Sequence, residues 1–402
     1  MLKSKFIYNS KKYKKFWLLI SLVLVMIVAM IVDSQFVVAK TDNANANKLS
    51  QVVMQVLDGI DFAELDNVVG ELASVELFGG SVKDKVAKLL SGEFFTNYSS
   101  VFQAVVSVFL VDIREFLPFL FTILAIGILS SLINEFKNGS DGTSDIIHFV
   151  CMSVMVITII FIFKDILSLV SDTLSILLKQ MKIIFPILLA LMTAIGSFSS
   201  VSIYNPLVAV LTTIVGFVFE KLLFPIFIVV FVLSILGNLT ETVKLGKLQS
   251  FLSSLFKWSI GIVFTLFTGF LSLQGITAGR YDSVSIKATK FAVKSYIPII
   301  GSYISEGMDF LVLGSVLVKN TVGLVGVFIL FLTVLSPIIS ILIIKLGLQL
   351  SGAILEMCGS KKLSEFTTSC SKLLVMPIVI ILGVAFMYLI TIALIMCTAN
   401  IF

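Results

Sequence analysis

Charged residues are scarce in this chain. Lysine, arginine, aspartate and glutamate make up 13% of its 402 residues, against about 25% in an ordinary soluble domain, and there is one histidine. The four cysteines show no C-x-x-C spacing, and no histidine lies near Cys358 or Cys370 to complete a metal site. No phosphate-binding glycine loop or nucleophile arrangement is present either. We therefore predict no enzyme activity, no metal site and no cofactor.

Apolar residues dominate instead, at 58% of the chain. Several uninterrupted runs exceed the roughly 18 apolar residues that mark a membrane-spanning helix. A transmembrane β-barrel would show segments of about ten residues that alternate between apolar and polar. The pattern predicts an all-α, polytopic helical membrane protein. The net charge of +5 then concerns membrane topology and does not indicate nucleic-acid binding.

The amino terminus has the pattern of a secretory signal. Six lysines precede the apolar run Phe16–Val32, and Val37–Ala39 offers a small-residue cleavage site. Because the run is longer than a usual signal core, residues 1–39 are predicted to be a signal peptide or an uncleaved signal anchor. Residues 40–116 are acidic and carry short amphipathic segments, which predicts a small helical extracytoplasmic domain that either stands alone or docks to a partner.

Residues 117–402 are predicted to form a multi-span membrane domain with about eight spans. We place these at Leu117–Asn134, Ile146–Phe163, Ile183–Ser199, Ile203–Phe219, Leu222–Leu239, Trp258–Gln274, Val322–Ile344 and Val375–Cys397. The segment Lys164–Lys182 is amphipathic and is predicted to lie at the membrane surface. Glu220-Lys221 is predicted to be a short turn between two spans.

One charged stretch, Ser272–Gly326, interrupts the apolar second half. A charge at mid-bilayer depth costs roughly 2.5–3.5 kcal/mol, so this stretch is predicted to lie outside the hydrocarbon, or against a wet cavity or a partner. The span count places 275–321, with five basic residues, on the outer face, although basic residues prefer the cytoplasmic side. Dropping one span between residues 183 and 239 would instead place the seven basic residues of 240–257 and 345–374 on the outer face. The side of 275–321 therefore stays open.

Seven polar residues are candidates for a conduit or a partner contact. Lys287, Lys290 and Lys294 follow an i, i+3, i+7 pattern that puts them on one face of a helix. They form a candidate basic stripe that lines an aqueous path or binds an anionic partner; the alternative is an interfacial helix whose lysines reach the headgroups. Arg280 is a further candidate for the conduit or the partner contact. Three amides at the ends of apolar runs serve either the same path or interhelical hydrogen bonds, namely Asn205, Gln274 and Asn320.

Several short motifs resemble one known family. They are SLQG at Ser272–Gly275, DSVSIKATKF at Asp282–Phe291, IPIIG at Ile297–Gly301, VKNTVGLVG at Val318–Gly326 and SIYNPL at Ser202–Leu207. With Leu223–Pro225 and Leu239–Glu241, they make the chain similar to the stage III sporulation protein AE family over about residues 110–402. The acidic region before them fits only in its length and its position after a signal.

The resemblance implies a multi-pass protein in the mother-cell membrane that surrounds the forespore. The family works with the other stage IIIA sporulation proteins and with stage II sporulation protein Q, in a channel complex that bridges two membranes and supports late forespore gene expression. We therefore expect a component that forms or gates a conduit for small molecules, in contact with lipid and compatible with a homo-oligomer. The alternatives are a non-conducting scaffold for the complex and a general secondary transporter.

Overall fold

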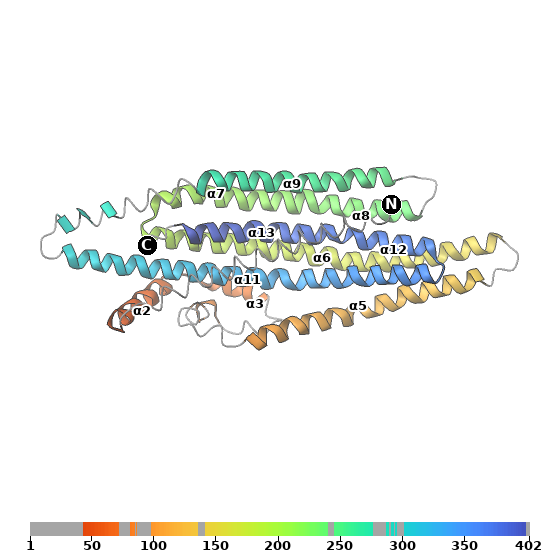
Figure 1. Ribbon diagram of the computed structural model, residues 1–402, viewed down its shortest axis with the longest axis horizontal. Coiled ribbons are helices and arrows are strands. Elements are labelled where there is room, and N and C mark those ends of the chain that lie inside the picture. Colours follow the sequence, from red (N-terminus) through yellow and green to blue (C-terminus); the bar gives the residue numbers. More distant parts are fainter. Residues whose placement is uncertain are drawn as a thin grey trace, which may run out of the picture.

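The computed structural model describes residues 43–71, 81–84, 86, 98–135, 141–239, 245–275, 287–288, 291–292, 294–295 and 301–398. Its long helices run side by side along one axis and form an elongated bundle (Figure 1). In chain order the helices are α2 (Asn43–Asp58), α3 (Ala63–Glu71), α5 (Tyr98–Glu135), α6 (Asp141–Ile195), α7 (Phe198–Val215), the π-helix η3 (Gly216–Leu223), α8 (Phe224–Leu239), α9 (Gly246–Gly275), α11 (Gly301–Met357), α12 (Lys361–Leu373) and α13 (Val375–Cys397). The described residues contain no strand, so the all-α prediction is confirmed for that part of the chain.

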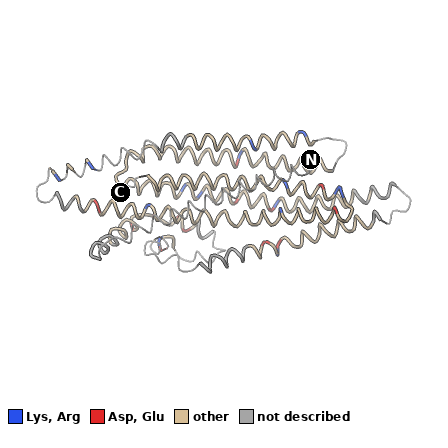
Figure 2. Tube along the Cα trace, in the orientation of Figure 1, with Lys and Arg blue, Asp and Glu red and all other residues tan. Residues whose placement is uncertain are grey.

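Six helical stretches among the described residues are long and apolar enough to cross a membrane. They are Phe109–Leu132, Phe149–Ile195, Phe198–Asn238, Gly246–Gly269, Gly307–Met357 and Lys361–Cys397. Charged residues interrupt these helices only sparsely (Figure 2). The predicted count of eight is not confirmed, because two pairs of predicted spans are each joined into one continuous helix.

The first of these joined helices is α6. The predicted surface segment Lys164–Lys182 is its middle part, and this placement is a correction to the sequence-based topology. Apolar side chains of this segment at three- and four-residue spacing are almost fully buried, among them Ile166, Val170 and Leu174. The segment contains no proline or glycine that would end a helix, and its charges occupy the outer face. Charge therefore lowers the hydropathy here without breaking the helix.

The second joined helix consists of α7, η3 and α8. Glu220 and Lys221 lie inside the π-helix and do not form the predicted turn. The turn that reverses the chain comes earlier, at Gly196, whose φ of 89° suits a residue without a side chain. A π-helix is wider than an α-helix and is frequent at functional sites.

Helix α11 is the centre of the bundle and packs against α2, α5, α6, α12 and α13. Glycines allow the closest of these approaches. A Cβ atom at Gly323 would collide with Met396 of α13, and one at Gly347 would collide with Phe116 of α5. Helices α6 and α11 contain 55 and 57 residues, and about 20 suffice to cross a bilayer, so each is much longer than one crossing requires.

The amino-terminal helices α2 and α3 lie against the bundle. Helix α2 packs on α11, and α3 packs on α6. Asp66 of α3 accepts hydrogen bonds from the backbone N–H of Val82 at 2.6 Å and from the hydroxyl of Ser81 at 3.1 Å. The predicted signal, residues 1–39, lies outside the described residues.

Candidate functional site

A groove runs between α6 on one side and α7 with η3 on the other; its lining is mainly apolar, and we call it the polar groove for the polar side chains set among the apolar ones. Its volume is about 730 Å³. Six of the residues that line it have polar side chains, namely Lys182, Thr193, Asn205, Thr212, Thr213 and Glu220. The groove lies within two of the candidate spans, so it places polar groups at the surface of helices that are otherwise suited to lipid.

The local sequence shapes this groove. The turn at Gly196 folds α7 back beside the end of α6, so that the two helices supply opposite walls. The walls approach each other at Gly216, where a Cβ atom would lie in ordinary contact, 3.6 Å from Leu178 of α6. Pro186 lacks a backbone N–H, so the carbonyl of Lys182 loses its usual helical partner. A backbone acceptor is thus freed on the groove wall.

The three threonine hydroxyls of the groove are already used. Each donates to the carbonyl four residues earlier in its own helix, at 3.0 Å from Thr193, 2.7 Å from Thr212 and 2.8 Å from Thr213. Such bonds satisfy a hydroxyl inside an apolar environment. The threonines therefore make the wall polar without leaving a strong donor free.

Two groove side chains are available to a ligand or to water. Lys182 and Asn205 are exposed, and their side chains have no partner among the residues that the structure describes. Glu220 instead forms an ion pair with the neighbouring Lys221 at 2.8 Å. The groove thus offers a free ammonium and a free amide, with a carboxylate that is already neutralised.

A second polar arrangement, at Lys319, is closed. Lys319 of α11 is fully buried, and its ammonium donates to the carbonyls of Met396, at 3.1 Å, and Thr398. The hydroxyls of Thr398 and Tyr204 are 2.9 Å apart and share a hydrogen bond. A cation at the carboxyl end of a helix is favourable because the last carbonyls carry partial negative charge. Lys319 therefore caps α13 and helps to join α7, α11 and α13.

Comparison with known proteins identifies the family. The family model described as stage III sporulation protein AE matches residues 80–399. The chain belongs to this family. It is also 24% identical, over 273 residues, to stage III sporulation protein AE of Bacillus subtilis (strain 168), a match that covers 68% of each chain. No solved structure matches it.

These contacts explain the structural role of Val318–Gly326, one of the segments in which the sequence resembles the family. Its Lys319 caps α13, its Gly323 accommodates Met396, and its Gly326 lies against Ile184 and Ile392. The motif therefore packs α11 against α6 and α13. Sequence reasoning counted Lys319 among the charges of a stretch outside the hydrocarbon and did not assign it this contact. The sequence feature that could have indicated this contact is a single lysine directly before an apolar run.

The predicted site residues are dispersed. Asn205 lies in the groove, and Asn320 is half-buried with a side-chain oxygen that has no partner in the described structure. Lys287 and Lys294 are exposed in helical segments between α9 and α11. Arg280, Lys290 and the side chain of Gln274 lie outside the described residues, so the basic stripe stays a prediction. Sequence reasoning missed Lys182 and Glu220, because both stand at the ends of predicted spans.

Proposed function

We propose that this protein is a membrane-integral component of the sporulation channel complex that links mother cell and forespore, and that it forms or gates a conduit for small molecules. It would lie in the mother-cell membrane around the forespore and support late forespore gene expression. Its partners would be the other stage IIIA proteins and stage II sporulation protein Q. Membership of the sporulation family supports this setting.

The polar groove is the observation that supports the conduit. A charged side chain that faces lipid at mid-membrane depth costs roughly 2.5–3.5 kcal/mol, so such groups normally face water or protein. Lys182 and Asn205 are exposed and unpaired in the described structure, whereas Val210 and Ile214, on the side of α7 away from the groove, are apolar and each 47% exposed. The groove would therefore form one wall of a water-filled path that a neighbouring subunit completes.

The scaffold alternative draws on the closed interior of the bundle. Helices α6, α11 and α13 pack tightly, and their contact surfaces include the fully buried Phe185, Ile329 and Tyr388. In this reading the groove is a docking surface that a partner fills completely.

Cysteine accessibility distinguishes the two. In a background with the four native cysteines replaced by alanine, single cysteines are placed at Asn205 and Thr213, with Val210 and Ile214 as lipid-facing controls. The conduit predicts that a membrane-impermeant thiol reagent labels both groove positions in the assembled complex and neither control. Groove positions that react in the isolated protein but are protected in the complex would indicate the scaffold. Groove positions as unreactive as the controls in both states would reject a wet groove.

A further inference from the structure

Helix α9 lies at the edge of the bundle and presents one whole face outward (Figure 1). It packs mainly on α8, with a smaller contact to α13, through buried residues such as Phe256 and Phe267. On the opposite face a notch of about 470 Å³ lies over Gly261. Its lining residues are Lys257, Trp258, Gly261, Ile262, Thr265 and Leu266.

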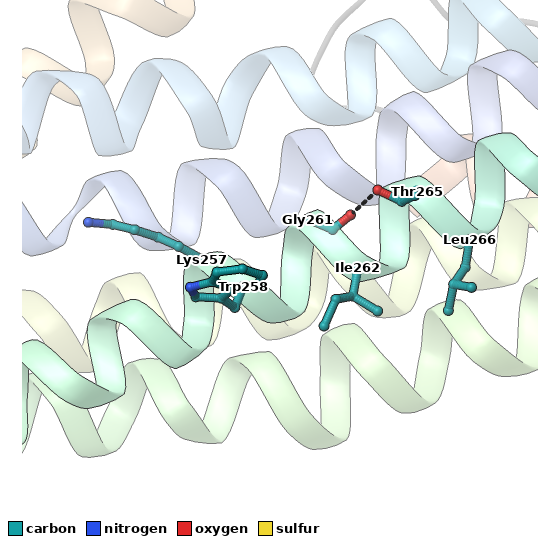
Figure 3. Close-up of a pocket in the computed structure, with 6 residues that line it drawn as sticks. All are labelled: Lys257, Trp258, Gly261, Ile262, Thr265 and Leu266. Atoms are coloured by element: carbon teal, nitrogen blue, oxygen red, sulfur yellow. Dashed lines mark hydrogen bonds between the residues drawn. The ribbon is translucent and has the colours of Figure 1, made fainter.

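The notch exists because Gly261 has no side chain between larger neighbours. A Cβ atom at Gly261 would meet no protein atom within 4 Å. Thr265 does not fill the space, since its hydroxyl turns back to the carbonyl of Gly261 at 2.8 Å (Figure 3). Ile262 and Leu266 project to the same side and border the notch with apolar surface (Figure 3). The floor is therefore open and suited to an extended apolar chain.

The amino-terminal end of the notch is polar and basic. Lys257 is exposed and unpaired within the described structure, and Trp258 is 72% exposed, so that its indole N–H is free to donate. These two residues also mark a change within α9. Residues 246–257 include two lysines and several serines, whereas 258–275 carry no charge. Lysine and tryptophan at such a boundary are typical of the level of lipid headgroups, so the proposal places the hydrocarbon at 258–275 and the polar first half of the candidate span Gly246–Gly269 outside it.

The charge around the notch has one sign. Helix α9 carries no acidic residue, and neither do α8 and α13, on which it packs. A second copy of α9 is a poor occupant for the notch. In a symmetric dimer whose twofold axis lies along the membrane normal, equivalent residues of the two copies lie at the same depth. Lys257 would then approach the Lys257 of the other copy with no carboxylate between them. A negatively charged occupant with an apolar tail fits both the charge and the shape.

We propose that this notch on α9 is a binding site for an anionic phospholipid. Lys257 and the Trp258 indole N–H contact the phosphate, and an acyl chain lies over Gly261 against Ile262 and Leu266. The site lies on a different helix from the polar groove and does not depend on the conduit. It would fix the depth of α9 at the edge of the bundle.

Tryptophan fluorescence provides the test, because the chain has two tryptophans and Trp17→Phe leaves Trp258 alone. The full chain is reconstituted in phosphatidylcholine vesicles that contain brominated phosphatidylglycerol or, separately, brominated phosphatidylcholine. We expect the anionic lipid to be enriched about fivefold at the indole, the factor for one lysine near anionic headgroups. Lys257→Gln should remove this preference, and Gly261→Leu should reduce quenching by filling the notch.

Two matched variants serve as controls. Lys247→Gln removes the other lysine of α9, and Gly269→Leu adds a side chain where a Cβ atom again meets nothing within 4 Å. Both should keep the preference. Equal quenching by the two lipids, or a preference that survives Lys257→Gln, would refute the site. So would loss of the preference on adding inorganic phosphate, which would indicate a free-anion site, and protection from both lipids, which would indicate cover by another protein helix.

Discussion

The junction at Lys319 and the groove at Lys182 are two polar regions in one apolar bundle, and they differ in what their polar groups contact. At the junction the ammonium is fully buried and donates to two backbone carbonyls. In the groove the ammonium of Lys182 is exposed and has no partner among the described residues. A buried polar group must be satisfied to be tolerated, whereas an exposed free one is available for binding. The comparison supports a structural role for the first region and the functional role that we propose for the second.

Loss of Lys319 should have the largest effect on stability. In Lys319→Met the carbonyls of Met396 and Thr398 lose a charged donor, and hydrogen bonds to charged groups contribute about 1.5–3 kcal/mol. We expect the free energy of unfolding to fall by about 2–3 kcal/mol, measured by denaturant unfolding in detergent. Lys345→Met on the same helix is the control, because the Lys345 side chain has no partner within the described structure. Equal losses in the two variants would refute the capping role.

The close approach of α11 to α5 should give the next largest effect. Gly347→Ala forces a Cβ atom against Phe116, and overpacking of this kind costs about 1–3 kcal/mol. Gly307→Ala, on the same helix, meets no atom within 4 Å and should instead stabilise by about 0.5–1 kcal/mol through helix propensity. Denaturant unfolding of the two variants under the same conditions checks that their free energies of unfolding change in opposite directions. If both substitutions stabilise the protein, α5 does not pack where the structure places it.

Groove substitutions should reverse the pattern, with a loss of activity and little loss of stability. Asn205→Leu and Thr213→Leu remove polar groups from the exposed groove, and surface changes usually stay within about 0.5 kcal/mol. We expect late forespore gene expression to fall severalfold while the amount of protein in the membrane stays normal. Ile214→Leu, on the lipid-facing side of α7, should leave expression unchanged. Normal expression in both groove variants would end the functional assignment of the groove.

The fold class and the family could be predicted from the sequence, but the joining of predicted spans into longer helices could not. Apolar composition predicted helices, and each of the six helical spans overlaps one predicted segment or joins two, although the four that match a single segment begin well before its predicted start. Hydropathy divided α6 at Lys164–Lys182 and α7–α8 at Glu220-Lys221, because it registers charge and not helix-breaking residues. Asn205 was predicted as a site residue, yet six of the 14 residues that line its groove come from another helix, α6. Which helix faces lie together depends on packing, as at Gly216 and Leu178, and no single-segment pattern contains that information.

Two buried tyrosines allow the same comparison between a satisfied and an unsatisfied polar group, with the smallest expected effect on stability. Tyr204 and Tyr388 are 1% and 0% exposed, but only Tyr204 shares a described hydrogen bond, with Thr398 at 2.9 Å, while the Tyr388 hydroxyl has no partner in the described structure. Tyr204→Phe should therefore lower the free energy of unfolding by about 0.5–1.5 kcal/mol. Tyr388→Phe removes an unsatisfied buried hydroxyl while keeping the ring that meets Phe185, so it should be neutral or stabilising. If Tyr388→Phe proves the more damaging, its hydroxyl has a bound water or a partner in the assembled protein, and the interior of the bundle is wetter than the described contacts indicate.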